Sequence, residues 1–512
     1  MRAAVIDIGS NSTKLVIGEK AGDDIKVLES LKNVVAIGQN TFYRARISQE
    51  IFNEIINVLE KYKTLIKQYE VTEIKVIATT AVREAENRDI FLDAVERKTG
   101  FKVEVLNVGD VVYFIDAFLS YKLKKKYPIN EKNLLIAEIG AGSLDISLLG
   151  KGYTLFNFGI PIGTLRKKQF KNMVEGSQRE VYEALDEYVE NEVVNLKRNI
   201  PALKLDDILL IDESYAAVLP SILPNIKREA EFFPLQFREA RRLLARVIRS
   251  NPDELTKKNN IPADIADTLD GYALVVNKLF KLIKKRSIFL LETSLSEALL
   301  ANMIFGFDLA EKYNKTNQLI SVAKFICSMY GSDLKHAKQV AFVAEGMFNQ
   351  LKGVLGLKDS DLLYLVLAAY LHNIGMFINN RSHHKHTEYI INALSFFRLS
   401  PQEIKCIACV ARYHRKAHPQ KTHYFYGGLP LNEQLLVQKL AAILRIANAL
   451  DSAHKQKVKK LEIQPGQGGG LTLVVYSNDN FALEKVFFKD RKQLFEEISG
   501  SQLGLTVKKQ TV

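Results

Sequence analysis

Two short stretches of this 512-residue chain place a carboxylate, glycine and hydroxyl side chains in the same order. The first is Asp7-Ile8-Gly9-Ser10-Asn11-Ser12-Thr13, which follows the apolar residues 3–6. Glycine lets the backbone bend without a Cβ in the way, and consecutive N–H groups with nearby hydroxyls can form a nest for a phosphate. Asp7 stands before the turn, where a carboxylate can hold a metal ion against phosphate oxygens. The stretch predicts a β-hairpin with a phosphate site at its tip, and an ordinary polar turn is the alternative.

The second stretch is Glu138-Ile139-Gly140-Ala141-Gly142-Ser143-Leu144-Asp145, between the apolar residues 134–137 and 146–149. Its layout repeats the first: strand, acid, glycine turn, hydroxyl and strand. Two hairpins of this kind can hold one phosphate from both sides. The repeat therefore favours the phosphate interpretation of both stretches.

This paired layout resembles the actin-like superfamily, and a longer set of motifs resembles one family within it. The motifs are residues 7–13, 78–87, 138–145 and 159–166, in that order. Together they resemble the Ppx/GppA family of exopolyphosphatases and guanosine pentaphosphate phosphohydrolases. The resemblance implies an α/β fold of two actin-like (ribonuclease H-like) lobes, Mg²⁺ as cofactor and a homodimer. It also implies release of terminal phosphate from inorganic polyphosphate, with guanosine pentaphosphate as a candidate second substrate.

The resemblance also implies roles for individual residues. Arg83 follows Thr79-Thr80 by one helical turn and would offset the charge that develops on the phosphate; a surface arginine is the alternative. The predicted metal ligands are the acids Asp7, Glu138 and Asp145. The residues predicted to hold the terminal phosphate through backbone N–H groups are Gly9, Ser10, Asn11, Ser12, Gly140, Ala141, Gly142 and Ser143.

The catalytic acid is the least settled of these roles. The family places a glutamate in a Glu-Glu-Ala-Arg-Leu-like segment, and residues 115–119 are the best match here. We therefore predict that Asp116 positions or deprotonates the attacking water. Asp110 competes, because Gly109-Asp110 imitates the start of the family segment, and a helix carboxylate without a role is a third interpretation.

All three predicted acids differ from the family pattern by one methylene group. Glu138 stands where the family has Asp, whereas Asp145 and Asp116 stand where it has Glu. A misplacement of about 1 Å can cost on the order of a hundredfold in rate. These departures motivate a second hypothesis, a catalytically weakened regulatory protein that binds polyphosphate or a nucleotide.

The elements that carry these residues follow from apolar periodicity. It predicts helices over residues 50–69, 110–124 and 178–198, and strands over 74–77, 103–106 and 208–211. Asp212-Glu213-Ser214 stands where the family has a Gly-Thr-rich loop, and its two acids would repel an anion. This argues against an actin-like kinase. The predicted domains are residues 1–125 and 126–307 for the two lobes, 308–458 for a helical domain and 459–512 for a small α+β module.

The third domain resembles an HD-type helical domain. His336, His372-Asn373, His386, His414 and residues 444–451 follow its order, in which histidines and two aspartates hold a metal. Asn373 and Asn448 stand at the aspartate positions, and a neutral carboxamide is a poorer ligand for a hard cation. We therefore expect an HD-like fold without HD metal chemistry, serving a structural, dimer-forming or substrate-binding role.

For two further clusters of residues that could bind a metal, we expect no metal site. His383-His384-Lys385-His386 is predicted to be a solvated basic loop, with a metal site as the alternative. Cys406 and Cys409 lie in an apolar helical pattern, so we expect both thiols in the core. No second cysteine pair completes a zinc set.

Composition limits the class of protein. An apolar content of 47% with 25% charged residues is typical of a soluble globular protein, and the net charge of +13 favours a polyanionic partner. Only this net charge favours nucleic-acid binding, so we do not expect nucleic acid as a partner. We also expect no membrane span and no signal peptide. Three cysteines make no disulfide framework, which fits the cytoplasm.

Overall fold

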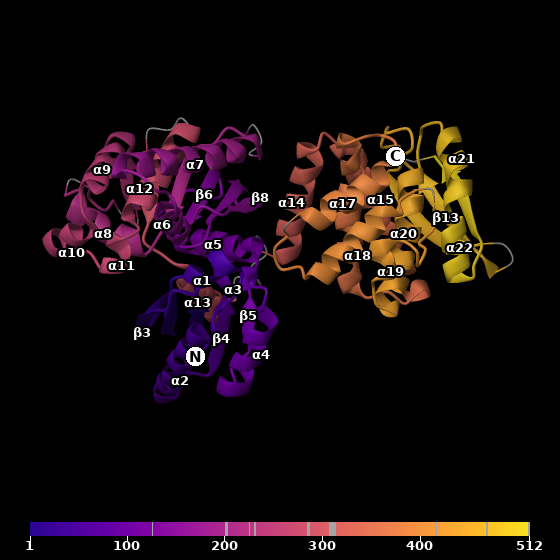
Figure 1. Ribbon diagram of the computed structural model, residues 1–512. Coiled ribbons are helices and arrows are strands. Elements are labelled where there is room, and N and C mark those ends of the chain that lie inside the picture. Colours follow the sequence, from indigo (N-terminus) through magenta and orange to yellow (C-terminus); the bar gives the residue numbers. More distant parts are fainter. Residues whose placement is uncertain are drawn as a thin grey trace. The chain divides into compact units, whose positions relative to one another are not determined.

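The computed structural model describes residues 1–124, 126–199, 203–224, 226–229, 232–283, 287–306, 314–394, 396–415, 417–466 and 469–509. They form two compact units, Met1–Asn314 and Lys315–Val512 (Figure 1). The predicted domain boundaries at residues 125 and 307–308 lie outside the described residues. Each unit is described by itself below.

Two sheets with the same strand order build the first unit. The first sheet has the order β3-β2-β1-β4-β5, and the second has β8-β7-β6-β9-β11-β10. In each, three antiparallel strands are followed by parallel ones, and β10 adds an antiparallel edge to the second sheet. This repeat confirms the α/β fold of two actin-like lobes. The strands are β1 (Arg2–Ile8), β2 (Ser12–Ala21), β3 (Asp24–Val34), β4 (Glu73–Ala78), β5 (Val103–Val105), β6 (Asn133–Ile139), β7 (Leu144–Gly150), β8 (Tyr153–Ile160), β9 (Asp207–Ile211), β10 (Phe232–Gln236) and β11 (Ser287–Leu291).

The two glycine hairpins occupy equivalent places in the two sheets. Strands β1 and β6 have the same burial pattern, with an apolar middle buried on both faces. Continuous apolar runs of this kind belong to central strands that are covered on both sides. In the first hairpin Asp7 lies opposite Lys14, and in the second Glu138 lies opposite Asp145.

Helices cover both sheets of the first unit (Figure 1). The predicted helices and strands are found within two residues of their expected ends. The helices are α1 (Ile37–Arg44), α2 (Gln49–Gln68), α3 (Thr80–Glu84), α4 (Arg88–Thr99), α5 (Val108–Lys122), α6 (Thr164–Met173), α7 (Gln178–Asn199), α8 (Ser214–Ile222), α9 (Phe237–Arg249), α10 (Pro252–Asn259), α11 (Ala263–Ala266), α12 (Leu269–Ile283) and α13 (Leu295–Phe305).

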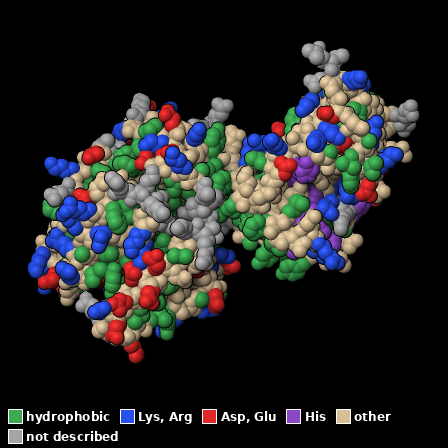
Figure 2. Space-filling view, turned by 90° about the horizontal axis from the view of Figure 1, so that it is seen from above, with side chains coloured by type: hydrophobic (Ala, Val, Ile, Leu, Met, Phe, Trp, Pro, Cys, Tyr) green, Lys and Arg blue, Asp and Glu red, His purple; other side chains and the backbone are tan. Residues whose placement is uncertain are grey.

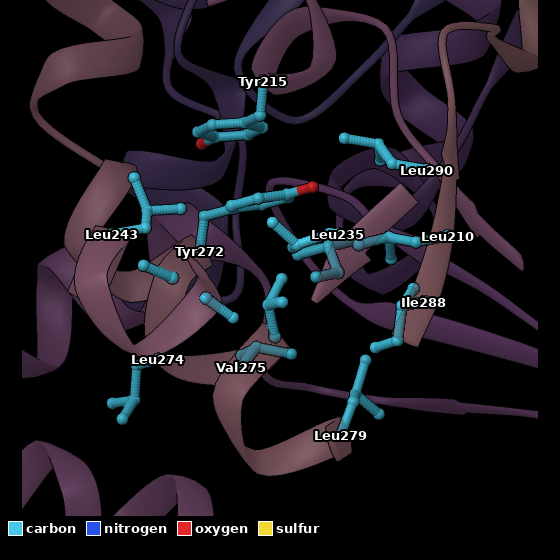
Figure 3. Packing of buried hydrophobic residues seen from close by; sticks show 14 of the residues in the cluster. Leu210, Tyr215, Leu235, Leu243, Tyr272, Leu274, Val275, Leu279, Ile288 and Leu290 are labelled. Carbon is cyan, nitrogen blue, oxygen red and sulfur yellow. The ribbon is translucent and has the colours of Figure 1, made fainter. Parts of the chain in front are cut away.

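The core of the second lobe fixes α8, whose first residues border a cleft. Figure 3 shows Tyr215 of α8 lying flat on Tyr272 of α12, and their ring centroids are 4.1 Å apart. Leu210, Leu235 and Leu290 from three strands of the second sheet pack around the pair. The loop between β9 and α8 is therefore attached to a rigid core.

Helices α5 and α13 lie between the lobes. Helix α13, which the predicted domains assign to the second lobe, packs on β1, β2 and α5 of the first. The rings of Tyr121 and Phe305 stack with centroids 5.0 Å apart, and Lys122 Nζ donates to Glu297 Oε1 at 3.0 Å. Helix α5 also contacts β7 and β8 of the second sheet. This double contact buries most of α5 and decides where Asp116 lies.

The second unit is mostly helical and ends in a small sheet of order β12-β13-β14. A helical region followed by an α+β tail agrees with the sequence, whereas its HD-like identity stays a prediction. Helix α17 starts at His383, so the loop predicted for residues 383–386 is wrong. The elements are α14 (Lys315–Met329), α15 (Leu334–Leu355), η3 (Asp359–Asp361), α16 (Leu362–Leu371), η4 (Ile374–Phe377), α17 (His383–Ala393), α18 (Pro401–Arg412), α19 (Tyr424–Gly427), α20 (Leu431–Ala449), β12 (Lys460–Pro465), β13 (Leu471–Tyr476), α21 (Ala482–Arg491), α22 (Gln493–Ser499) and β14 (Leu503–Lys508).

One segment, Asp359–Phe377, is long and apolar enough to cross a membrane by length and composition. It consists of α16 between two 3-10 turns, and the residues from Leu365 to Leu371 are buried within the unit. Core helices of folded domains satisfy the same test. The segment therefore forms part of the core of the second unit.

Candidate functional site

A cleft of about 200 Å³ in the first unit is bordered by both glycine hairpins. The two tips therefore face one cavity, as a shared phosphate site requires. Residues from both tips line it, and all eight predicted phosphate contacts are among them: Gly9, Ser10, Asn11, Ser12, Gly140, Ala141, Gly142 and Ser143.

Both tips close in the same way. Gly9 N–H donates to Ser12 O at 3.0 Å, and Gly140 N–H donates to Ser143 O at 2.9 Å. A helix start then holds each turn from outside. Gly38 N–H of α1 donates to Ser10 O at 2.8 Å, and Leu165 N–H of α6 donates to Ala141 O at 2.9 Å. The turn carbonyls are thus engaged with the protein, which fixes the shape of each tip.

The second tip also touches the first lobe. A Cβ on Gly142 would lie 2.7 Å from Phe42 Cζ and 2.9 Å from Thr80 Cβ, so only glycine fits there without a shift. The hydroxyls of Thr80 and Ser143 lie 3.2 Å apart, at hydrogen-bond distance. Arg166 Nε donates to Gly142 O at 2.7 Å. These contacts hold the two tips on either side of one cleft.

The three predicted metal ligands line this cleft. Burial raises the pKa of Asp7 to about 6, and nearby Lys14 opposes that rise. Burial, followed by the charges of Asp145, Asp7 and Asp212, raises the pKa of Glu138 to about 8. Burial also raises the pKa of Asp145 to about 6, against the pull of Arg83. The pKa values of these carboxyl groups are raised because burial outweighs the nearby positive charges.

The carboxylate oxygens fit a hard divalent cation. Asp7 Oδ1 and Asp145 Oδ1 are buried and have no hydrogen-bond partner in the described part of the chain. Buried unpaired oxygens are costly, and a cation among them would remove that cost. The described residues contain no group of three or more His, Cys, Asp or Glu arranged to hold a metal.

Lysines on the cleft wall are the feature that sequence reasoning missed. Lys14 Nζ donates to Glu213 Oε2 at 2.6 Å, and Lys32 Nζ donates to Asp264 Oδ2 at 2.7 Å. The Lys14 contact offsets one of the two acids that we expected to repel an anion. The other, Asp212, accepts Tyr215 N–H at 2.6 Å at the start of α8. The alternation of β2 offered a signal, since Lys14 lies directly opposite Asp7.

Arg83 lies beside the cleft, behind Thr80. Its Nη1 donates to Leu106 O at 2.7 Å, and its Nη2 donates to Thr80 Oγ1 at 3.2 Å. Thr80, which does line the cleft, connects it to Ser143. Arg83 is therefore placed to act on Asp145 and on the second tip.

The structure does not bring Asp116 to the cleft. The side chain is 1% exposed, and its Oδ2 accepts hydrogen bonds from Ser147 Oγ at 2.8 Å and Thr154 Oγ1 at 2.9 Å. The cause is the packing of α5 on β7 and β8. A separate cavity of about 10 Å³ joins Asp116 to Glu138 and Asp145. Burial raises the pKa of Asp116 to about 7.

The competing acid, Asp110, has a local structural role. Its Oδ2 accepts Asn107 N–H at 3.3 Å, while Asn107 Oδ1 accepts Asp110 N–H at 2.9 Å, which forms the capping box of α5. The described residue that α5 contributes to the cleft wall is Val111. Neither candidate acid lines the cleft.

Comparison with known proteins gives the family context of this site. A family model described as the Ppx/GppA phosphatase family matches residues 16–305, and one described as Ppx/GppA phosphatase, domain III matches residues 319–486. A guanosine-5'-triphosphate,3'-diphosphate pyrophosphatase of Pseudoalteromonas translucida is 24% identical over 468 residues, which are 87% of this chain and 86% of the relative.

Two solved structures share the fold. A crystal structure of an exopolyphosphatase from Cytophaga hutchinsonii superposes with a TM-score of 0.53 at 19% identity, covering 60% of this chain and 98% of the other. The Aquifex aeolicus member of the Ppx/GppA family does so with a TM-score of 0.50 at 21% identity, covering 60% and 98%.

Proposed function

The chain belongs to the Ppx/GppA phosphatase family, and from that premise we propose that it hydrolyses the terminal phosphoanhydride bond of inorganic polyphosphate. Guanosine pentaphosphate is the second substrate in this proposal, because a relative of similar length carries that activity in its name. The observation that carries the proposal is the single cleft lined by both glycine tips and by all three predicted metal ligands.

The tips supply the binding of the terminal phosphate. The backbone N–H groups of residues 10–12 and 141–143 would hold its oxygens, because those of Gly9 and Gly140 already donate within the turns. The hydroxyls of Ser12 and Ser143 lie in the same cleft. Fixed donors need no reorganisation as charge develops in the transition state, so they lower the barrier. Lys14 adds a positive charge in the same cleft.

The cleft carboxylates supply the ligands for Mg²⁺ in this proposal. Asp7, Glu138 and Asp145 would hold the ion directly or through its waters. When bound, the ion neutralises phosphate charge and favours ionisation of water. Arg83 would keep Asp145 ionised. Asp116 acts in this proposal as a positioning residue, since it faces Glu138 and Asp145 across a cavity close to the smallest size that holds one water.

A substrate panel tests the proposal. Phosphate release from long-chain polyphosphate, guanosine pentaphosphate and ATP is measured with Mg²⁺ and with EDTA. The proposal predicts Mg²⁺-dependent release from the first two substrates and little from ATP. Release from ATP alone would instead indicate an ATPase or kinase.

The second candidate is a binding protein with little turnover, and Val111 favours it. Helix α5 presents this apolar side chain to the cleft where an acid would be needed to activate water directly. Under this alternative, polyphosphate binds tightly in equilibrium dialysis while the phosphate-release assay stays at background.

Two properties of the whole protein complete the proposal. Residues Cys327, Cys406 and Cys409 are buried free thiols, which agrees with a reducing cytoplasm. The homodimer implied by the family is checked by light scattering of the purified protein; a monomer mass would remove it.

A further inference from the structure

Two lysines of the first sheet form a row with Asp7 that runs to the edge of the sheet. Asp7 lies directly opposite Lys14 on the neighbouring strand β2, and Lys14 lies directly opposite Lys32 on the edge strand β3. Side chains of directly opposite residues in antiparallel strands point to the same face of the sheet. All three side chains accordingly line the cleft. With about 4.8 Å between neighbouring strands, the row spans roughly 10 Å from Asp7 to Lys32.

Each lysine of this row is paired with an acid of the second lobe. Lys14 Nζ donates to Glu213 Oε2 at 2.6 Å, and Lys32 Nζ donates to Asp264 Oδ2 at 2.7 Å. Glu213 directly precedes α8, and Asp264 lies in α11. Like charges directly opposite each other on one face of a sheet are destabilising, and the two acids offset that repulsion. Both ion pairs therefore connect the two walls of the cleft.

The described residues that line the cleft are predominantly acidic. Lys14 and Lys32 are the basic side chains among them. The acidic side chains are Asp7, Glu138, Asp145, Asp212, Glu213 and Asp264. Figure 2 shows acidic as well as basic side chains over one face of the first unit, so the net charge of +13 does not by itself provide a path for a polyanion. A phosphate chain that extends from the tips needs the cations of this lining.

The outer ion pair is accessible to a ligand. The side chains of Lys32 and Asp264 are 34% and 21% exposed. An ion pair in contact with water contributes little to stability, so a phosphate can replace its carboxylate at low cost. A phosphate also brings more acceptor oxygens to the ammonium group than a carboxylate does. The outer pair is thus suited to exchange its acid for a phosphate.

We propose that Lys32 binds a phosphate behind the terminal one, and that Asp264 is the counterion which this phosphate displaces. The inference rests on the proposed function, because it places the terminal phosphate at the glycine tips. Lys14 lies between Asp7 and Lys32 in the row and would face the phosphate in between. A single phosphate held at the tips does not reach Lys32, whereas a linear phosphate chain does. The outer pair therefore makes the site select phosphate chains.

A binding assay tests the role of Lys32. Isothermal titration calorimetry with Mg²⁺ gives Kd for orthophosphate and for linear tetraphosphate, a short chain that contacts few charges outside the cleft. In the full-length protein, Lys32→Met should weaken tetraphosphate binding about fivefold, the size expected of a partly exposed ion pair, and leave orthophosphate binding unchanged. The control Lys26→Met, on the same strand but outside the cleft lining, should change neither. Equal tetraphosphate affinity in wild type and Lys32→Met would overturn the proposal.

The counterion gives a second, independent variant. Asp264→Asn frees Lys32 from its carboxylate, so tetraphosphate should bind about threefold more tightly than to wild type. In the double variant Lys32→Met, Asp264→Asn this gain should disappear, because no ammonium group remains to be freed. A gain that persists in the double variant would show that Asp264 acts by general repulsion, which would overturn its role as the counterion of Lys32.

The two assays separate this inference from the hydrolase proposal. Tetraphosphate binding that responds to both variants, with no phosphate release, would support the inference and contradict hydrolysis. Phosphate release from polyphosphate in wild type, with tetraphosphate binding that ignores both variants, would contradict the inference alone. A wild-type protein that neither binds tetraphosphate nor releases phosphate would contradict both.

Discussion

At the scale of single residues, Asp7, Glu138 and Asp145 are buried cleft carboxyl groups with raised pKa values. Their pKa values rise from 3.8 or 4.5 to about 6 for Asp7 and Asp145 and about 8 for Glu138. A raised carboxyl pKa means that the folded state binds more protons than the unfolded chain between these limits. The stability they contribute is present below about pH 4 and is lost as pH rises through 6 to 8.

We therefore expect the first unit of the metal-free protein to melt at a lower temperature at pH 8 than at pH 5. The contribution of Glu138 is on the order of a few kcal/mol, because one unit of pKa corresponds to about 1.4 kcal/mol. Calorimetry in EDTA measures this, and Glu138→Gln should flatten the pH dependence. A slope unchanged by Glu138→Gln would show that its pKa is ordinary.

Asp116 makes a different prediction. If it acts through Glu138 and Asp145, Asp116→Asn should lower kcat by about 10–100-fold with little change in KM, the usual size of such an indirect effect on a metal site. Steady-state kinetics on polyphosphate, with Asp93→Asn as an exposed control, gives both constants. Equal rates would remove Asp116 from the mechanism, and a loss above ten-thousandfold would restore direct contact with the water.

The sequence predicted the position of both hairpin tips, but it did not predict which face of α5 borders the cleft. The difference has a physical reason. Glycine turns after apolar strands have few alternative conformations, so residues 9–12 and 140–143 could be predicted to form the tips of two hairpins. Helix α5 is buried from Gly109 to Ser120 on all sides and has no amphipathic face to set its rotation. Periodicity could therefore not tell that Val111, and not Asp116, faces the cleft.

At the scale of elements, the tips depend on the helix starts behind them. A Cβ on Gly163 would lie 2.2 Å from Ala141 O, which is backbone and cannot move cheaply. Gly163→Ala should push α6 from the second tip, destabilise the first unit by about 1–3 kcal/mol and lower activity. Thermal unfolding and phosphate release measure the two effects.

Gly353→Ala is the matched control for that variant. Nothing lies within 4 Å of a Cβ at Gly353, which sits inside α15. Alanine there should stabilise the helix by about 0.5–1 kcal/mol and leave phosphate release unchanged. If Gly163→Ala behaves in the same way, the close contact between α6 and the tip is not needed.

The positions of helices and strands along the chain were easier to predict than the elements against which they pack. The helix starts at His383 after Ser382, which has a left-handed φ of 61°, a conformation that sequence seldom announces for serine. That change of direction turns a predicted loop into a helix whose first residue is buried against His414. Likewise α13 follows the second lobe in the chain but packs on the first sheet.

At the scale of the whole molecule, the candidate cleft lies in the first of two compact units. A ligand stabilises only the part of a protein that it binds, by mass action. Mg²⁺ with phosphate should therefore raise the unfolding transition of the first unit and leave that of the second unchanged. Calorimetry of the full-length protein measures both transitions, and an equal rise of both would contradict a site confined to the first unit.

The central claim is that one cleft holds both the metal and the terminal phosphate, and Asp7 tests it most directly. Asp7 lines the cleft and has a buried oxygen without a partner, so Asp7→Asn removes a metal ligand with little change of shape. Phosphate release from polyphosphate with saturating Mg²⁺ is compared for wild type, Asp7→Asn and the exposed control Asp93→Asn. The account predicts at least a hundredfold loss for Asp7→Asn and none for the control. Equal rates in all three proteins would contradict it.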